Sequence, residues 1–121
     1  MDEQIEDKLR PVKWLLMDVD GVMTDGTAFY GDGGFEGLQF NIHDGAGVKY
    51  LRRAGLRAGI ITGRTTDAVL TRAEQLGVDE VVRGAKVKIE AYEEIQQRQE
   101  FADEEVCYAG DDLTDMPVMR R

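Results

Sequence analysis

The chain has 121 residues, of which 24 are acidic and 15 are basic, and its formal net charge is −9. This acidic balance excludes nucleic-acid binding, because a protein that neutralises phosphate backbones needs a basic face. The length suits one globular domain, so residues 1–121 are predicted to fold as a single unit.

Cysteine content and apolar runs indicate where such a protein would reside. Cys107 is the only cysteine, so no disulfide can form within the chain, and its place in an apolar strand predicts a small core residue. Residues 1–10 lack the apolar stretch of a signal peptide, and no later apolar run approaches the ~20 residues of a membrane span. We therefore expect a cytoplasmic protein that does not bind membranes.

The N-terminal half predicts a buried strand, a hairpin and a helix. The apolar run 13–19 ends at Asp20-Gly21, as a buried parallel strand does at a polar loop. Aromatic residues on both sides of a glycine-rich turn predict a β-hairpin over 26–42. A helix is predicted over 44–54, with Asp44 as its cap.

The remaining elements alternate between strand and helix. The pattern predicts strands over 57–62, 78–82 and 105–109, and helices over 65–76 and 86–99. Such alternation with short loops indicates an α/β fold with an open parallel sheet and right-handed crossovers. Ligands of these sheets bind at the carboxyl ends of the strands, where this chain places Asp18, Asp20, Thr62, Asp111 and Asp112.

The acidic residues at these strand ends predict a Mg²⁺ site. Asp18 and Asp20 are two positions apart, so their side chains can face one small volume and repel each other. A hard cation relieves that repulsion, and Mg²⁺ binds one or two carboxylates together with water and phosphate oxygens. Asp111 can complete the site, while Asp112 and Asp115 orient it from outside.

This arrangement suits phosphoryl transfer. An aspartate can attack phosphorus to form an aspartyl-phosphate, and Asp20 can act as general acid for the leaving alcohol and then as base for water. The transferred group needs donors, which Thr62 can supply as a hydroxyl and a lysine as a point charge. Lys88 is the first candidate for that lysine, and Lys86 is the alternative.

The motifs carry a resemblance to a known family. The segment Asp18-Val-Asp-Gly-Val-Met-Thr-Asp-Gly26 resembles the first motif of the haloacid dehalogenase superfamily of phosphohydrolases. Thr62, Lys88 and the segment Gly110-Asp-Asp-Leu-Thr-Asp115 follow in the order of its other motifs. Segments 34–47, 60–64 and 110–119 resemble more closely the cap-less 3-deoxy-D-manno-octulosonate 8-phosphate (KDO 8-phosphate) phosphatases of lipopolysaccharide biosynthesis.

That resemblance implies a three-layer Rossmann-like fold with a hairpin flap over 26–42 and no cap domain. It implies the following site: Asp18 as nucleophile and metal ligand, Asp20 as acid/base and ligand through its carbonyl, Asp111 as ligand, and Thr62, Gly63 and Lys88 around the phosphate. It also implies a homotetramer in which the hairpins form a central barrel. The aromatic hairpin independently favours an interface. Family members continue beyond the position of Arg121, so a C-terminal part is expected to be missing.

Two further residues are candidates for substrate contact. Arg64 can bind a sugar carboxylate as a bidentate donor, although a surface arginine at a helix start explains it equally well. His43, the only histidine, stands at a predicted helix start, where capping or contact with the substrate's edge is favoured over catalysis.

Three alternatives to KDO 8-phosphate hydrolysis remain open on the sequence. The motifs do not separate this substrate from a nonulosonate 9-phosphate. A receiver-type phospho-acceptor domain shares the doubly wound fold, but it places adjacent acids after its first strand and an acceptor aspartate after its third. A catalytically silent scaffold is the third alternative.

Overall fold

A computed structural model describes all 121 residues and confirms the α/β class. The central sheet has four parallel strands in the order β5-β4-β1-β6, namely β1 (Trp14–Met17), β4 (Arg57–Ile61), β5 (Glu80–Val82) and β6 (Val106–Ala109). Trp14 lies opposite Arg57 of β4 and Val106 of β6. Strand β1 is therefore central, and the carboxyl ends of all four strands point the same way.

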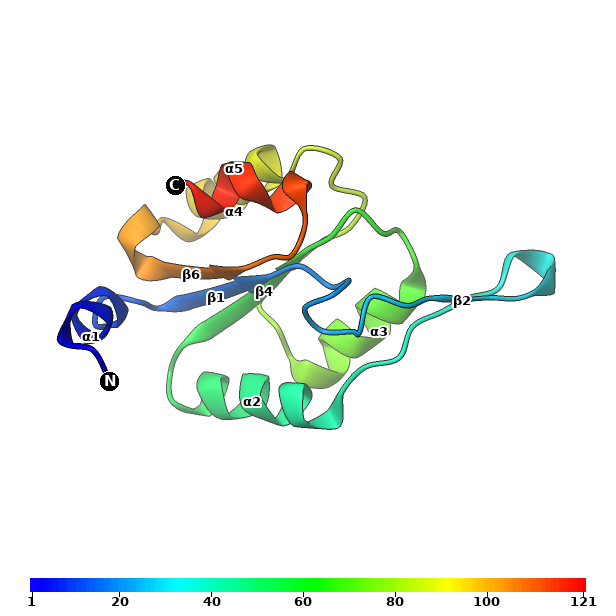
Figure 1. Cartoon of the computed structure of the whole chain (residues 1–121), viewed down its shortest axis with the longest axis horizontal. Coiled ribbons are helices and arrows are strands. Elements are labelled where there is room, and N and C mark those ends of the chain that lie inside the picture. Colours follow the sequence, from blue (N-terminus) through cyan, green and yellow to red (C-terminus); the bar gives the residue numbers. More distant parts are fainter.

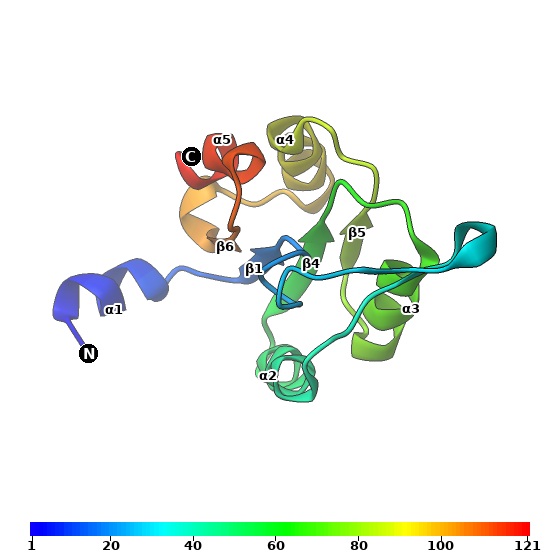
Figure 2. The ribbon, with the colours of Figure 1, turned by 45° about the vertical axis from the view of Figure 1, so that its right-hand side comes forward.

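Helices cover both faces of this sheet and make the three layers that the sequence predicts (Figure 1). On one face lie α2 (Ile42–Arg53) and α3 (Asp67–Leu76), and on the other lie α4 (Lys88–Gln99) and α5 (Met116–Met119). The turned view in Figure 2 shows the same separation of the two helix pairs. Short 3-10 turns, η2 (Asp103–Glu105) and η3 (Leu113–Asp115), flank β6.

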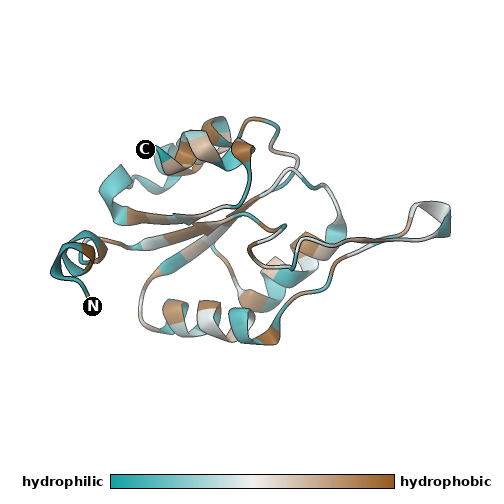
Figure 3. Ribbon diagram, viewed as in Figure 1, coloured by the Kyte–Doolittle hydropathy of each residue, from teal (hydrophilic) through white to brown (hydrophobic).

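The core is divided by the sheet into two apolar clusters. Leu16 faces α4 and packs with Ile95, whereas Met17 faces α2 and α3 and packs with Val48 and Val69. This alternation is the period of two that strand geometry imposes. Apolar colouring follows the strands in Figure 3. Burying each such side chain contributes about 1.5–3 kcal/mol, so the sheet is the rigid part of the molecule.

The hairpin is shorter than the sequence predicts. Only β2 (Phe29–Tyr30) and β3 (Glu36–Gly37) pair, on either side of a 3-10 turn, η1 (Asp32–Gly34). The ribbon extends away from the sheet (Figure 1), so no other element supports the rest of the predicted 26–42 segment as a ladder. Its aromatic residues Phe29, Tyr30 and Phe35 are 57%, 74% and 62% exposed.

All three predicted helices begin elsewhere than predicted. Helix α3 begins at Asp67, two residues after the predicted start, because the Thr66 side chain caps it by accepting from the N–H of Ala68. Helix α2 begins at Ile42, because the Oδ1 atom of Asn41 accepts hydrogen bonds from the backbone N–H groups of His43 (2.8 Å) and Asp44 (3.2 Å). The prediction that Asp44 caps this helix was wrong, since Asn41 satisfies the free amide groups first. Helix α4 begins at Lys88, two residues after the predicted start.

Two other features differ from the sequence predictions. Cys107 is exposed and is not a core residue, because β6 is an edge strand and the face at Cys107 is left uncovered. A short helix, α1 (Glu3–Leu9), precedes the sheet, is capped by Asp2 and buries none of its residues. The structure contains no helix of the length and apolar character that membrane crossing requires.

Candidate active site

The parallel strands bring polar side chains to one edge of the sheet. Asp18 directly follows β1 and Thr62 directly follows β4. Each extends the strand ladder by one bond, since the N–H of Asp18 donates to the carbonyl of Ala109 (2.9 Å) and that of Thr62 to Val82 (2.9 Å). The ladder therefore fixes both backbones, and both residues are buried, with 5% and 1% of their surface exposed.

A cleft of about 550 Å³ opens at this edge. Its lining combines the loops after all four strands with the start of α4. It consists of Asp18, Asp20, Gly26, Gly63, Arg64, Ala85, Lys86, Lys88, Asp111, Asp112 and Thr114. Most of the predicted site residues thus lie together. Thr62 sits beneath the lining, directly before Gly63.

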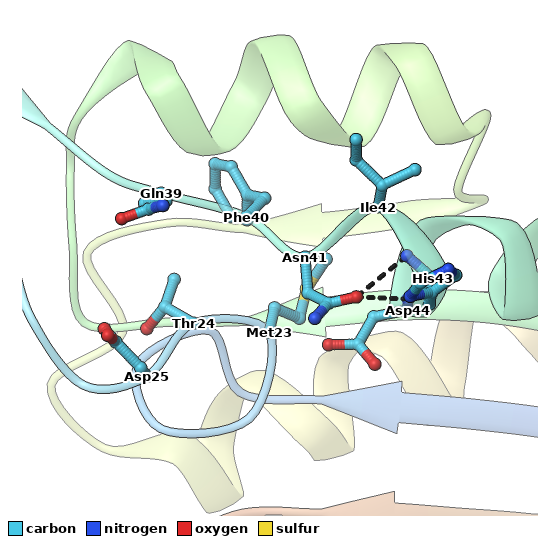
Figure 4. A pocket seen from close by; sticks show the side chains of 9 residues that line it. All are labelled: Met23, Thr24, Asp25, Gln39, Phe40, Asn41, Ile42, His43 and Asp44. Atoms are coloured by element: carbon cyan, nitrogen blue, oxygen red, sulfur yellow. Dashed lines mark hydrogen bonds between the residues drawn. The ribbon is translucent and has the colours of Figure 1, made fainter.

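A second hollow has the same volume, about 550 Å³, so size does not identify the site. It lies between the loop after β1 and the start of α2, where Asn41 caps the helix (Figure 4). His43 lines this hollow and is absent from the acidic cleft. The structure therefore does not place His43 with the other candidates, and substrate contact by His43 stays a prediction.

Lys88 is buried beside the proposed nucleophile. Its Nζ atom lies 2.9 Å from Oδ1 of Asp18 and 2.8 Å from Oδ1 of Asp115. Burial works to lower the pKa of Lys88, but these hydrogen bonds and charges outweigh it and leave that pKa raised. Burial also raises the pKa of Asp18, against the effect of the lysine. Lys86 lines the cleft, is exposed and has no ion pair.

Asp115 connects the lysine to the loop after β6. Its Oδ1 atom accepts hydrogen bonds from Lys88 and from the hydroxyl of Tyr108 (2.5 Å). Its Oδ2 atom accepts from the backbone N–H groups of Asp111 and Asp112, both at 3.2 Å. Burial works to raise the pKa of Asp115, yet the hydrogen bonds from Lys88 and Tyr108 prevail and the pKa is lowered. Asp115, fully buried, is therefore held as a carboxylate.

The oxygen donors of this cleft fit a hard cation. Carboxylate oxygens of Asp18, Asp111 and Asp115 lie within 4.8 Å of one another. Asp115 has both oxygens engaged by protein donors, whereas the carboxylate of Asp111 accepts no hydrogen bond from the chain. Two carboxylates with space for water suit Mg²⁺. The carbonyl of Asp20, also free of hydrogen bonds, is a third available donor.

The hydroxyl group of Thr62 is free to donate a hydrogen bond to a ligand. Its Oγ1 atom accepts a hydrogen bond from the backbone N–H of Arg64 (3.1 Å), which leaves its own hydrogen available to a ligand. The carbonyl of Thr62 accepts from the N–H of Ala85 (2.9 Å), so the two loops are joined. Asp112 lies in the cleft wall, and its carboxylate accepts from the N–H of Leu113 (2.6 Å).

Asp20 is paired with Arg64. The Nε atom of Arg64 lies 2.8 and 2.7 Å from the two carboxylate oxygens of Asp20. The Nη1 atom of the same guanidinium contacts the carboxylate of Glu36 on β3 and lies 3.4 Å from the hydroxyl of Tyr30 on β2. Hydrogen bonds with Tyr30, Asp20 and Glu36, together with the charge of Asp20, raise the pKa of Arg64 further above its usual range.

Sequence reasoning missed three residues of this site. The sequence pattern predicts only a strand position for Tyr108, although its position opposite Leu16 places it on the face that α4 covers. For Glu36 and Tyr30 the pattern predicts only hairpin positions. Alternation along β6 offered a signal for Tyr108, but no local pattern indicates the long-range partners of Arg64.

Comparison with known proteins gives consistent matches. A family model described as haloacid dehalogenase-like hydrolase matches residues 39–121. The 3-deoxy-D-manno-octulosonate 8-phosphate phosphatases KdsC of Escherichia coli K12 and Yersinia pestis are 36% and 40% identical over 114 and 108 residues. These alignments cover 94% and 89% of this chain but 61% and 58% of the relatives. The chain thus spans about three fifths of their length.

Solved structures agree over almost the whole chain. A putative 3-deoxy-D-manno-octulosonate 8-phosphate phosphatase from Vibrio cholerae matches with a TM-score of 0.94 and 39% identity, over 99% of this chain and 67% of that one. The phosphatase from Moraxella catarrhalis, solved with magnesium, phosphate and KDO, matches with a TM-score of 0.94 and 32% identity, over 99% and 69% of the two chains.

Proposed function

We propose that this chain, which belongs to the haloacid dehalogenase-like hydrolases, is a Mg²⁺-dependent phosphomonoesterase that acts on a sugar-acid phosphate. One observation carries the proposal: buried Asp18 has the ammonium of Lys88 at 2.9 Å and the carboxylate of Asp111 within 4.8 Å. The names of the relatives, and the magnesium, phosphate and KDO of the Moraxella structure, support KDO 8-phosphate as the first substrate.

Asp18 is the nucleophile in this proposal. Its carboxylate oxygen bonds to phosphorus while the bond from phosphorus to the sugar oxygen breaks, which gives an aspartyl-phosphate. Lys88 provides positive charge, and Thr62 provides a hydroxyl hydrogen, for the phosphoryl oxygens. Gly63, at the cleft wall, presents backbone without a side chain in the same place. Water then releases phosphate and restores Asp18.

Asp20 is the general acid and base in this proposal. It donates a proton to the departing sugar oxygen, and as a carboxylate it then takes a proton from the attacking water. Asp18, Asp111 and the carbonyl of Asp20 would hold the Mg²⁺, which supplies positive charge when the anionic substrate approaches these carboxylates. Asp115 and Asp112 support this set from the loop after β6.

The alternatives from the sequence have different signatures. A nonulosonate 9-phosphate would use the same phosphoryl chemistry and differ in the sugar-binding residues, for which Arg64 and His43 stay candidates. A receiver-type domain would accept one phosphate without turning over a sugar phosphate. Such a domain has its acceptor aspartate after the third strand of the sheet. In this chain that strand is β5, which is followed by Arg83 and Gly84 and by no carboxylate, so the observation disfavours a receiver.

We also propose a homotetramer assembled through the hairpins. Phe29, Tyr30 and Phe35 project from the body with most of their surface exposed, and gathered exposed aromatic residues are typical of interaction sites. The hairpin is connected to the cleft, because Glu36 of β3 contacts Arg64 in the cleft wall. A neighbouring chain packed on the hairpin would therefore enclose the cleft. An exposed, unpaired Cys107 suits a reducing cytoplasm, the location that we propose.

The test is phosphate release from KDO 8-phosphate with Mg²⁺ and with a chelator added. We expect metal-dependent turnover that Asp18→Asn reduces by a factor of about 10⁴ or more, because the nucleophile is lost. Asp7→Asn on α1 is the matched control, since Asp7 is exposed and far from the cleft. Release that is unaffected by Asp18→Asn, or no release from any sugar-acid phosphate, would contradict the proposal.

A further inference from the structure

Arg64 is the only side chain that connects the proposed acid/base with the hairpin. We propose that Arg64 is a positioning residue for Asp20 and that Glu36 holds Arg64 in place. The position of the hairpin relative to the cleft then controls how well Asp20 can protonate the leaving group. This inference rests on the proposed function. It goes further by assigning to Arg64 and Glu36 a role in one chemical step.

The carboxylate of Asp20 depends on Arg64 for its orientation. Both of its oxygens contact Nε of Arg64, at 2.8 and 2.7 Å, and neither accepts a hydrogen bond from any other group of the chain. Asp20 also lies beyond the end of β1, in the turn that leads to Gly21, so the strand ladder does not fix it. Without the guanidinium, this side chain would be free to rotate away from the cleft.

Arg64 in turn is held at its backbone and at its far end. Its N–H donates to Oγ1 of Thr62 (3.1 Å) and its carbonyl accepts from the N–H of Gly84 (2.9 Å). The Nη1 atom contacts Glu36 and lies 3.4 Å from the hydroxyl of Tyr30. The side chain is 20% exposed, which is low for an arginine at the molecular surface. The guanidinium therefore bridges a rigid loop and the hairpin.

The paired part of the hairpin is followed by Leu38 and Phe40, which pack against the core. It projects beyond the sheet (Figures 1 and 2), and only two residues on each side pair across it. Glu36 belongs to the short strand β3, so a shift of the ribbon moves the carboxylate that holds Nη1. A rigid fork such as a guanidinium passes that movement to Nε and to Asp20, whereas a flexible ammonium does not.

The chemistry of the leaving group provides a specific readout. A departing alkoxide needs a proton, so misplacing a general acid slows the hydrolysis of alkyl phosphates. A p-nitrophenolate leaves readily without a proton, so the same change barely affects p-nitrophenyl phosphate. The ratio kcat/KM is the appropriate quantity, because it reports the steps up to formation of the aspartyl-phosphate and excludes the later attack of water.

The experiment compares three substrates: KDO 8-phosphate, glycerol phosphate, which is an alkyl phosphate without a carboxylate, and p-nitrophenyl phosphate. For Arg64→Lys we expect kcat/KM to fall about tenfold or more on both alkyl phosphates and less than about threefold on the aryl phosphate. For Glu36→Gln we expect the same pattern at about one third of the loss. Asp32→Asn at the hairpin tip, an exposed residue without a side-chain partner, is the control.

A double variant tests whether Arg64 acts through Asp20. On glycerol phosphate, Arg64→Lys should have little further effect once Asp20→Asn is present, because the group that it orients is gone. Equal losses on all three substrates, a loss confined to KDO 8-phosphate, or full additivity with Asp20→Asn would each overturn the inference. Absence of phosphate release by the unsubstituted chain from every substrate would instead overturn the proposed function, and this inference with it.

Discussion

A Cβ atom at position 21 would lie 1.7 Å from Oδ2 of Asp111, so Gly21 and Asp111 can occupy their places only while Gly21 has no side chain. The loop after β1 and the loop after β6 thus meet at a carboxylate that we propose as a Mg²⁺ ligand. Gly21 also has a φ of +76°, which residues with a Cβ atom rarely adopt.

Gly21→Ala should therefore weaken Mg²⁺ binding. The new methyl group displaces the carboxylate of Asp111, and we expect the affinity to fall about tenfold, as for other groups that orient metal ligands. Isothermal titration with Mg²⁺ measures it. Gly33→Ala is the control, because Gly33 has a similar φ of +74° but open space around its Cβ position. An equal loss of affinity in both variants would refute the role of the close approach.

Asp115→Asn should reduce activity although Asp115 is not assigned as a metal ligand. The substitution weakens the hydrogen bond from Lys88 and places an amide where two backbone N–H groups and a hydroxyl now donate. We expect kcat to fall about tenfold or more, and the free energy of unfolding to fall by about 2 kcal/mol. Phosphate release and urea denaturation measure the two effects.

Tyr108→Phe provides the graded comparison for Asp115→Asn. It removes one donor to Oδ1 and keeps the charge of Asp115, so its effect on both quantities should be smaller. Tyr50→Phe, at a tyrosine that is 65% exposed, should change neither. If Asp115→Asn left kcat unchanged in folded protein, the carboxylate would have no part in orienting Lys88.

The stability of the fold should depend on the ionisation of Asp79. Burial works to raise the pKa of Asp79, but hydrogen bonds from Arg52 and from the N–H of Ala58 outweigh it, and the pKa is lowered. A carboxyl whose folded pKa lies below its unfolded value of about 3.9 stabilises the protein above that pH, and the stabilisation is lost as pH falls through the folded pKa. Asp79→Asn should therefore cost about 1 kcal/mol at pH 7.

Measuring the free energy of unfolding at several pH values tests the prediction for Asp79. The difference in unfolding free energy between the wild type and Asp79→Asn should be constant from about pH 6 to 8 and should shrink below about pH 4. Urea denaturation at several pH values measures it. Asp7→Asn, at an aspartate whose side chain is 75% exposed, is the control and should change the unfolding free energy little. A difference that grew toward acid pH would have the wrong sign.

The sheet and the main site residues could be predicted because both follow from local patterns. Short apolar runs that end in polar residues marked β1, β4 and β6, and parallel strands bring those ends together. Asp18, Thr62 and Asp111 follow directly from this rule. Lys88 needed the motif order as well, since its position on an amphipathic helix predicts a solvated charge as readily as a buried one.

The rest depends on contacts between distant segments. Arg64 meets Glu36 and Asp20 only because the hairpin passes the loop after β4, and no periodicity encodes that passage. Cys107 has the neighbours of a core residue in sequence, but its strand lies at the edge of the sheet. Strand order decides its exposure, and strand order is a property of the whole chain.

The pairing of β1 with β6 also orders events during biosynthesis. Trp14 lies opposite Val106, which is far along the chain from it, so one flank of β1 stays open until β6 has left the ribosome. An open strand can pair with another nascent chain, which leads to aggregation. When β6 docks on β1, it therefore closes that flank and at the same time brings Asp111 to the cleft. Substitutions in β6 should consequently lower the yield of soluble protein as well as its activity.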